Sequence, residues 1–220
     1  MVKYIHLMTK CALFDRIGEK DLLTMLSCLR AQVLSFEAQQ PIMHQGSAAK
    51  HLGILLSGEA CIAYIDETGT HDIVATLAGG DLFAETFAAA GCSVLPVSVI
   101  ASSACSVLLL EYSRVITGCS NGCMAHSYLV TNLLHILACK NLLLKQKMDI
   151  IMKRTTREKL TAYLREQQKC AGQARFRIPF DRQGLADYLG VERSAMCAEL
   201  SRMKKDGLID YCKNEFTLIF

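Results

Sequence analysis

The sequence predicts an α+β protein built from three consecutive parts, and three observations support this prediction. Residues 33–110 contain short apolar runs separated by glycine-rich turns about every ten residues, which is typical of an antiparallel β-sandwich or β-roll. Residues 123–151 carry a heptad repeat of apolar positions, which indicates one long helix. Residues 182–219 combine the spacing of two short helices with a hairpin. We therefore expect parts at residues 1–118, 119–152 and 153–220.

The composition is that of a globular, intracellular protein. The chain has 220 residues, of which 51% are hydrophobic and 20% charged, so it is long enough to bury a core and too apolar to be disordered. Its 11 cysteines do not indicate a secreted disulfide framework, because their number is odd, no Cys-x-x-Cys pair occurs and the first residues lack an apolar signal core. We expect a reducing, cytoplasmic location. No membrane span is expected, because charged and polar residues interrupt the apolar stretch 129–152.

The first part is expected to be a β-roll with a helix beside it. Helical spacing in residues 20–29 predicts that helix. Apolar runs bounded by turn residues then predict strands, and these runs are 52–56, 60–65, 73–77, 97–101 and 105–110. The turns between them are rich in glycine, as at Ser57-Gly58 and Gly79-Gly80.

The long helix is expected to pair with a second copy of the chain. Its apolar positions alternate at spacings of three and four, which is the seam of a coiled coil with a single Asn at a seam position. The seam residues are Val130, Leu134, Leu137, Asn141, Leu144, Met148 and Ile151. The alternative is one amphipathic helix lying on its own domain. A second stripe, formed by Leu129, Leu133, Ile136 and Leu143, indicates that the helix faces both its own domain and a partner.

The third part has the spacing of a helix-turn-helix. Ala186 permits a close helix crossing, Gly190 makes the turn, and Met196 shares one face of the second helix with Leu200 and Met203. Asp206-Gly207 ends that helix, and two short apolar runs flank Lys213-Asn214, which predicts a β-hairpin wing. A strand is expected over residues 176–180, and a helix ending near Gly172 precedes it.

The charge distribution indicates that this third part binds DNA. The whole chain has a formal charge of +3, which names no partner. Residues 1–118 carry −4, residues 119–152 carry +2, and residues 153–220 carry 14 basic and 9 acidic side chains, or +5. A basic terminal domain with a helix-turn-helix is the electrostatic footprint of double-stranded DNA binding. The residues expected to contact DNA are Arg182, Gln183, Arg193, Ser194, Cys197, Arg202 and Lys204.

The ordered motifs resemble those of Crp/Fnr-superfamily transcriptional regulators over nearly the whole chain. The motifs are Leu13-Phe14, Gln45-Gly46, Leu56-Ser-Gly-Glu, Thr68-Gly69 and Gly80-Asp-Leu-Phe-Ala-Glu85, followed by the long helix and the winged helix-turn-helix. The resemblance implies a cyclic-nucleotide-binding-like β-roll, a homodimer and RNA polymerase as a partner. The recognition helix departs from the family pattern, because Ser194 replaces an acidic residue and Ala198 replaces a second arginine, so the usual half-site is not expected.

The resemblance places an effector pocket in the β-roll. Its expected residues are Gly80, Asp81, Leu82, Phe83, Ala84, Glu85, Thr86, Leu95, Pro96, Val97, Leu129 and Leu133. Cyclic-nucleotide binders of the family pair a glutamate with an Arg-Ser, whereas this chain has Leu95-Pro96 at those positions. Because the arginine that would neutralise the phosphate is missing, we expect no tight binding of cyclic AMP. Cys11 and Cys28 do not match the clustered cysteines of the family's iron–sulfur sensors, and neither His71 nor His126 is marked as a haem ligand.

One cysteine cluster remains open to three interpretations. Cys119, Cys123 and His126 fall at i, i+4 and i+7, on one face at the start of the long helix. These side chains suit zinc or iron, they could oxidise to a disulfide between subunits, or they are ordinary core residues. The cofactor is therefore unknown, and a small-molecule effector or a redox signal would gate the protein.

Two other function classes are alternatives to a dimeric DNA-binding regulator. A non-catalytic sensor module that regulates a partner protein would share the β-roll. A cupin-type metalloenzyme would need a His-x-His pair, and His44, His51 and His71 are spaced wrongly for it. We expect no enzymatic activity and no membrane partner.

Overall fold

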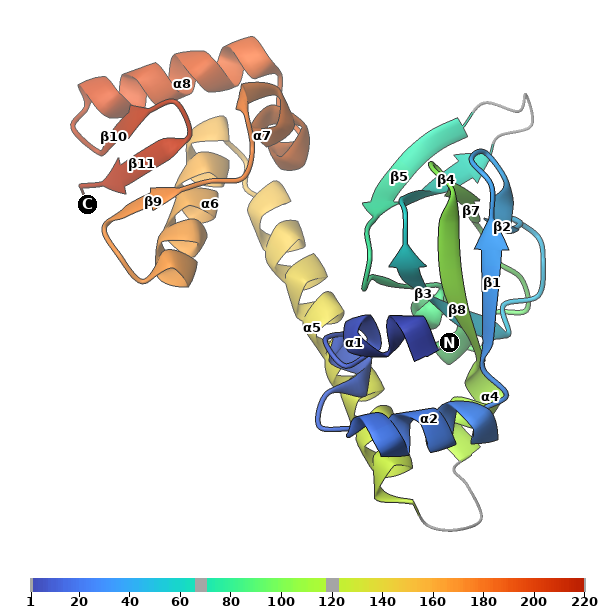
Figure 1. The fold of residues 1–220 in the computed structure, drawn as a ribbon. Coiled ribbons are helices and arrows are strands. Elements are labelled where there is room, and N and C mark those ends of the chain that lie inside the picture. Colours follow the sequence, from blue (N-terminus) through green and yellow to red (C-terminus); the bar gives the residue numbers. More distant parts are fainter. Residues whose placement is uncertain (1, 66–70, 118–122, 220) are drawn as a thin grey trace. The chain divides into compact units, whose positions relative to one another are not determined.

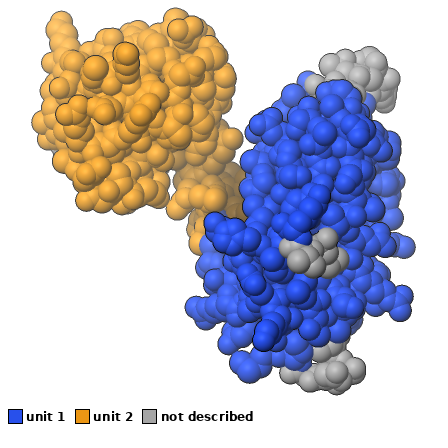
Figure 2. All heavy atoms as spheres, viewed as in Figure 1, with its two compact units in different colours: residues 1–139 blue, residues 140–220 orange. Residues whose placement is uncertain are grey.

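A computed structural model describes residues 2–65, 71–117 and 123–219. The chain divides into two compact units, residues 1–139 and 140–220 (Figure 2). The boundary between the units falls inside the long helix α5 (Met124–Ile151), whereas the sequence suggested one boundary on each side of this helix, after residues 118 and 152. Each unit is described on its own below.

Unit 1 contains two four-stranded antiparallel sheets, and the antiparallel β-roll that the sequence predicted is confirmed. The first has the strand order β1-β8-β3-β6, with β1 (Gln32–Phe36), β8 (Cys105–Glu111), β3 (His51–Ser57) and β6 (Leu82–Phe83). The second has the order β2-β7-β4-β5, with β2 (Pro41–Met43), β7 (Ser98–Ala101), β4 (Ala60–Ile65) and β5 (His71–Leu77). Strands far apart in the sequence pair with each other, such as β1 with β8 and β2 with β7, which is the topology of a roll. The Thr68-Gly69 turn lies outside the described residues.

One core of unit 1 includes residues from both sheets. Its buried members include Leu55, Phe83, Leu95, Val99 and Val107. Gly53 of β3 lies against the ring of Phe83, its partner in β6, and a Cβ at that position would stand 2.2 Å from Phe83 Cζ. The glycine therefore lets the short strand β6 pack flat on β3.

A second core joins the N-terminal helices to the first half of α5. The helical segments are η1 (Val2–Tyr4), α1 (Ile5–Met8), η2 (Ala12–Phe14), α2 (Glu19–Cys28) and α4 (Tyr112–Thr117). Leu13, Leu22, Leu129 and Leu133 are buried together in this core. Asn132 Nδ2 donates to the carbonyls of Leu13 and Asp15 at 3.0 and 2.8 Å. These contacts explain why α1 and α2 lie beside α5 in Figure 1.

Helix α5 matches the predicted long helix and leaves much of its predicted seam exposed. Leu134, Leu144 and Met148 are 63%, 62% and 60% exposed. Leu143, a member of the second apolar stripe, is 65% exposed as well. By length and composition α5 is also apolar enough to cross a membrane, contrary to expectation, although a single helix of this kind is weak support for a span.

Unit 2 is a small α+β domain that ends in a hairpin. Helix α6 (Thr156–Ala171) begins with a capping box between Thr155 and Glu158 and ends at Gly172 in the left-handed conformation. It is followed by β9 (Arg175–Arg177), α7 (Arg182–Leu189), α8 (Arg193–Lys205), β10 (Ile209–Cys212) and β11 (Glu215–Leu218). The three strands form one antiparallel sheet in the order β10-β11-β9.

Candidate nucleic-acid interface

Helices α7 and α8 form the predicted helix-turn-helix. The carboxylate of Asp181 accepts from Gly184 N at 2.7 Å and caps α7. Gly190 ends α7 with φ +60°, a conformation that favours glycine and allows the tight turn. Met196 and Leu200, both completely buried, hold α8 against the core of unit 2. The opposite face of α8 is therefore left toward solvent.

Glu192 caps the N-terminus of α8. Its carboxylate accepts from the backbone N–H of Ser194 at 2.9 Å and of Ala195 at 2.7 Å, and also from the Ser194 hydroxyl. These hydrogen bonds lower the pKa of the Glu192 carboxyl below its ordinary value. Ser194, which the sequence assigned to DNA contact, thus has its hydroxyl committed to Glu192, whereas the adjacent Arg193 is exposed.

The wing is the hairpin of β10 and β11. Cys212 pairs with Glu215 across a two-residue turn, in which Lys213 has φ +50°. Primed turns with positive φ match the twist of two-residue hairpins. The carbonyl of the other turn residue, Asn214, accepts from Ile178 N at 2.9 Å, which connects the turn to the chain just after β9.

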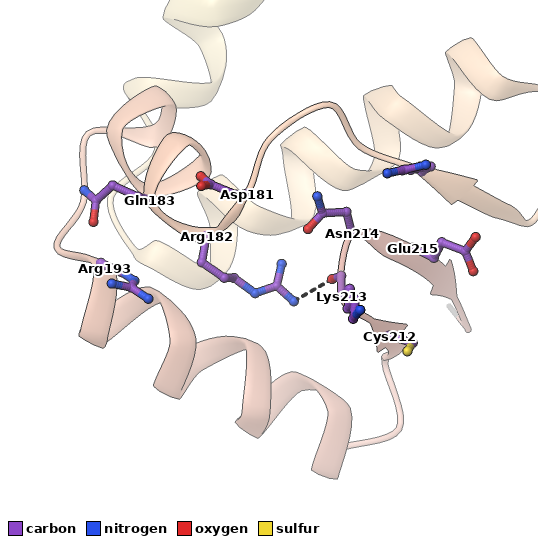
Figure 3. Close-up of a pocket in the computed structure, with 9 residues that line it drawn as sticks. Asp181, Arg182, Gln183, Arg193, Cys212, Lys213, Asn214 and Glu215 are labelled. Carbon is purple, nitrogen blue, oxygen red and sulfur yellow. Dashed lines mark hydrogen bonds between the residues drawn. The ribbon is translucent and has the colours of Figure 1, made fainter.

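A basic hollow lies between the wing and the starts of α7 and α8. Its volume is about 630 Å3, and Figure 3 shows the side chains around it. The lining residues, called the wing hollow below, are Arg177, Asp181, Arg182, Gln183, Arg193, Cys212, Lys213, Asn214 and Glu215. Four are cations and two are carboxylates. Both carboxylates have other partners, since Asp181 caps α7 and Glu215 pairs with Arg175 at 2.5 Å. The wing hollow therefore suits an anion.

The structure gathers three of the seven predicted DNA-contact residues at the wing hollow. These are Arg182, Gln183 and Arg193. Arg182 Nη2 donates to the carbonyl of Lys213 at 2.9 Å, and Gln183 Nε2 donates to Asp187 at 2.8 Å. In Figure 3 Arg182 is joined to Lys213 by its hydrogen bond, whereas no hydrogen bond joins Arg193 to another lining residue.

The other four predicted residues lie along α8 outside the hollow. Ser194 is held by Glu192 as described. Cys197 is half-buried against the core. Arg202 pairs with Glu199 at 2.8 Å, and Lys204 pairs with Asp210 at 2.7 Å, an interaction that raises the pKa of Lys204. Both cations of this group, Arg202 and Lys204, are thus already paired within the domain.

Arg177, Lys213 and Asn214 were not among the predicted site residues. Lys213-Asn214 was identified only as a turn, and Arg177 as part of a strand. A positive residue at the tip of a predicted wing was the one sequence signal that could have drawn attention to Lys213. Arg177 becomes adjacent to the hollow only through strand pairing, because it lies opposite Glu215.

The predicted effector residues form a compact group only in part. Glu85, at the start of α3 (Glu85–Ala89), is 2% exposed and accepts from Thr86 Oγ1 at 3.2 Å. Leu95 is 3% exposed and packs in the same core as Phe83 and Ala84. Leu129 and Leu133 lie in the other core of unit 1, so the structure does not bring them together with Leu95.

The predicted metal cluster lies partly outside the described residues. Cys119 lies outside them, and no group of three metal-ligating side chains occurs in the ranges that the structure describes. His126 is buried, and its Nε2 lies 2.7 Å from the carbonyl of Val115 in α4. The ten described cysteines are free thiols.

Comparison with known families accounts for both units. The cyclic nucleotide-binding domain family matches residues 33–120, and the Crp-like helix-turn-helix domain family matches residues 158–219. The order of the two matches, first the cyclic nucleotide-binding domain and then the helix-turn-helix, agrees with the order of the motifs in the sequence. No curated protein sequence matched the chain.

Solved structures show the same fold at low sequence identity. The catabolite activator protein of Thermus thermophilus is 18% identical, with 94% of this chain and 93% of that chain covered and a TM-score of 0.54. The sensor domain of the regulator DNR from Pseudomonas aeruginosa is 16% identical, with coverages of 70% and 97% and a TM-score of 0.53. The global regulator CLP from Xanthomonas campestris is 14% identical, with coverages of 89% and 98% and a TM-score of 0.51. The chain belongs to the Crp/Fnr superfamily of DNA-binding transcriptional regulators.

Proposed function

We propose that this regulator binds double-stranded DNA with the exposed face of α8 and the wing hollow. The observation that carries the proposal is the gathering of Arg177, Arg193 and Lys213 around one hollow at the start of α8. Arg193 would contact a base edge in the major groove, while Lys213 and Arg177 would contact phosphates beside it. Promoter-bound regulators of this family work with RNA polymerase, and we propose the same partner in the cytoplasm.

Binding of a fluorescent duplex, measured by anisotropy over a range of salt concentrations, tests this function. We expect log affinity to fall linearly with log salt concentration, as counterions leave the DNA. Arg193→Ala should weaken binding by about 5- to 100-fold, the range for loss of one good base contact. Lys169→Ala removes one positive charge from the exposed end of α6 and should change affinity less than about twofold. Salt-independent binding, or equal effects of both variants, would contradict the proposal.

We propose that the protein acts as a homodimer through α5. The support is the row of exposed apolar side chains at seam positions, since 60% exposure of residues such as Met148 is unfavourable in water. A dimer would present two copies of α8 to two half-sites. An effector or redox signal sensed in the β-roll would bias the pairing of the two α5 helices.

We propose that the effector is not cyclic AMP. Leu95 fills its position with a buried alkyl group, and a phosphate at that place would meet no cation from this residue. Titration calorimetry with cyclic AMP should therefore give no binding heat in the micromolar range. Micromolar affinity would show that a cation from elsewhere replaces the missing arginine. The protein is proposed to be non-catalytic, and the Cys119, Cys123 and His126 cluster remains a prediction for a metal or redox site.

A further inference from the structure

The aromatic ring of Tyr211 in the wing lies close to two cations, one from each helix of the helix-turn-helix. The Arg182 guanidinium carbon lies 5.0 Å from the centre of the ring, and Lys204 Nζ lies 5.2 Å from it. Arg182 is the first residue of α7, and Lys204 is in the last turn of α8. Cation–π contacts at such distances attract the cation to the ring face. The wing strand β10 is thus attached to both helices.

Arg182 also holds the turn of the wing. Its Nη2 donates to the carbonyl of Lys213 at 2.9 Å (Figure 3). Its guanidinium carbon also lies 5.3 Å from the ring centre of Phe216 in β11. Its Nη1 is buried and has no hydrogen-bond partner among the described residues. The guanidinium therefore contacts both strands of the hairpin and the turn between them.

Lys204 is committed to the wing in a similar way. Its ammonium pairs with Asp210 at 2.7 Å and donates to the carbonyl of Tyr211 at 3.4 Å. An ammonium with a carboxylate, a carbonyl and a ring around it has fewer donors left for a DNA phosphate. The same holds for Arg182, whose planar group is occupied by a carbonyl and two rings.

We infer that Arg182 and Lys204 are positioning residues: they hold the wing in place and so fix the position of Lys213. In this assignment the ammonium group of Lys213, and not the side chain of Arg182 or Lys204, contacts DNA. This assignment rests on the proposed DNA-binding function and refines it. The bond from Arg182 reaches the carbonyl of Lys213 and not its side chain. Loss of Arg182 therefore loosens the turn and, with it, the position of the Lys213 ammonium.

A double-mutant cycle in DNA affinity separates positioning from direct contact. Lys213→Ala removes the ammonium but keeps the carbonyl that Arg182 needs, and should weaken duplex binding about 3- to 10-fold. Arg182→Ala should weaken it at least as much. The double variant should bind like Arg182→Ala, within about twofold, because the ammonium is already misplaced. Additive losses would show that Arg182 contacts DNA by itself and would overturn the assignment.

Hydrogen exchange in the free protein tests the same assignment without DNA. Arg182→Ala and Tyr211→Leu should speed hydrogen exchange of the wing amides in residues 209–218. Lys213→Ala keeps the backbone carbonyl that accepts from Arg182, and Tyr211→Phe keeps the aromatic ring, so neither of these two variants should change that exchange. Arg182→Lys keeps the charge but loses the planar group, so it should also speed exchange and serves if the alanine variant misfolds. Unchanged wing exchange in both Arg182 variants would overturn the assignment. Failure of the wild type to bind DNA would instead overturn the proposed function alone.

Discussion

The side chain of Glu192 stabilises the N-terminus of the recognition helix α8. Carboxylates are favourable at a helix N-terminus because they accept from free N–H groups and face the positive end of the helix dipole. Here the Glu192 carboxylate accepts from two backbone N–H groups and from the Ser194 hydroxyl. Its position also leaves the neighbouring Arg193 with a negative charge beside it. The cap therefore stabilises the helix and reduces the positive charge at the start of α8.

Replacing Glu192 should make the stability of unit 2 less dependent on pH. Because hydrogen bonds lower the folded-state pKa of Glu192, its contribution is complete above the ordinary glutamate pKa of 4.5 and is lost as pH falls through the lower folded value. Glu192→Gln should lower the melting temperature by a few degrees near neutral pH, and by progressively less as the pH falls below 4.5. Thermal unfolding followed by circular dichroism from pH 3 to 7 measures this. Glu192→Asp keeps a good cap and should behave like the wild type, and a gap that persists unchanged at low pH would contradict the prediction.

The pairing of β3 with β6 depends on one glycine. A methyl group at Gly53 would collide with the buried Phe83 ring at 2.2 Å, and β6 leads directly into the region of Glu85. Gly53→Ala should therefore destabilise unit 1 by about 1–3 kcal/mol, the usual cost of overpacking. Calorimetric unfolding checks this. Gly79→Ala is the matched control, because a Cβ there would meet nothing within 4 Å, and an equal loss in both variants would contradict the packing argument.

Elements with strong local signals were predictable from the sequence. Gly190 and Met196 marked α7 and α8 correctly, and glycine-bounded apolar runs marked the strands of the roll. The strand expected over residues 176–180 ends at Arg177, because Pro179 has no N–H for the ladder. The left-handed conformation of Ala84, φ +60°, gave no local signal, because most residues other than glycine avoid it.

The wing hollow could not be predicted as a unit, because its residues meet only through tertiary packing. Arg182 and Lys213 are 31 residues apart, and no period connects them. The sequence identified Arg182 as a cation near a helix start, which suggested a phosphate contact. Its actual neighbours, a carbonyl and two rings, depend on where the hairpin packs. The charge pattern thus located the DNA-binding domain but did not distinguish cations that face DNA from cations that support the wing.

At the scale of the whole molecule, disruption of the α5 seam should separate the proposed dimer. Leu144→Glu with Met148→Glu places two carboxylates per helix at positions that would be buried between subunits, which is strongly unfavourable. We expect a shift from dimer to monomer at micromolar concentration and a loss of DNA affinity of more than about tenfold. Sedimentation velocity measures the first and anisotropy the second.

Gln146→Glu adds a carboxylate to the same helix outside the predicted seam and serves as the control. It should leave the sedimentation of the protein unchanged, because position 146 stays exposed to water on the predicted dimer. If the wild type sediments as a monomer, or if Gln146→Glu dissociates it as fully as the seam variant does, α5 is not the dimer interface.

The end of α5 belongs to the core of unit 2. Ile150 is 6% exposed among the apolar residues of that core, and Lys147 Nζ lies 5.0 Å from the ring centre of Tyr188 in α7. A fragment cut at residue 153, where the sequence suggested a boundary, would leave an unfilled apolar site where Ile150 packs. A fragment cut at residue 140 would keep that site filled. A stable fragment of unit 2 that carries the helix-turn-helix therefore includes the last three turns of α5.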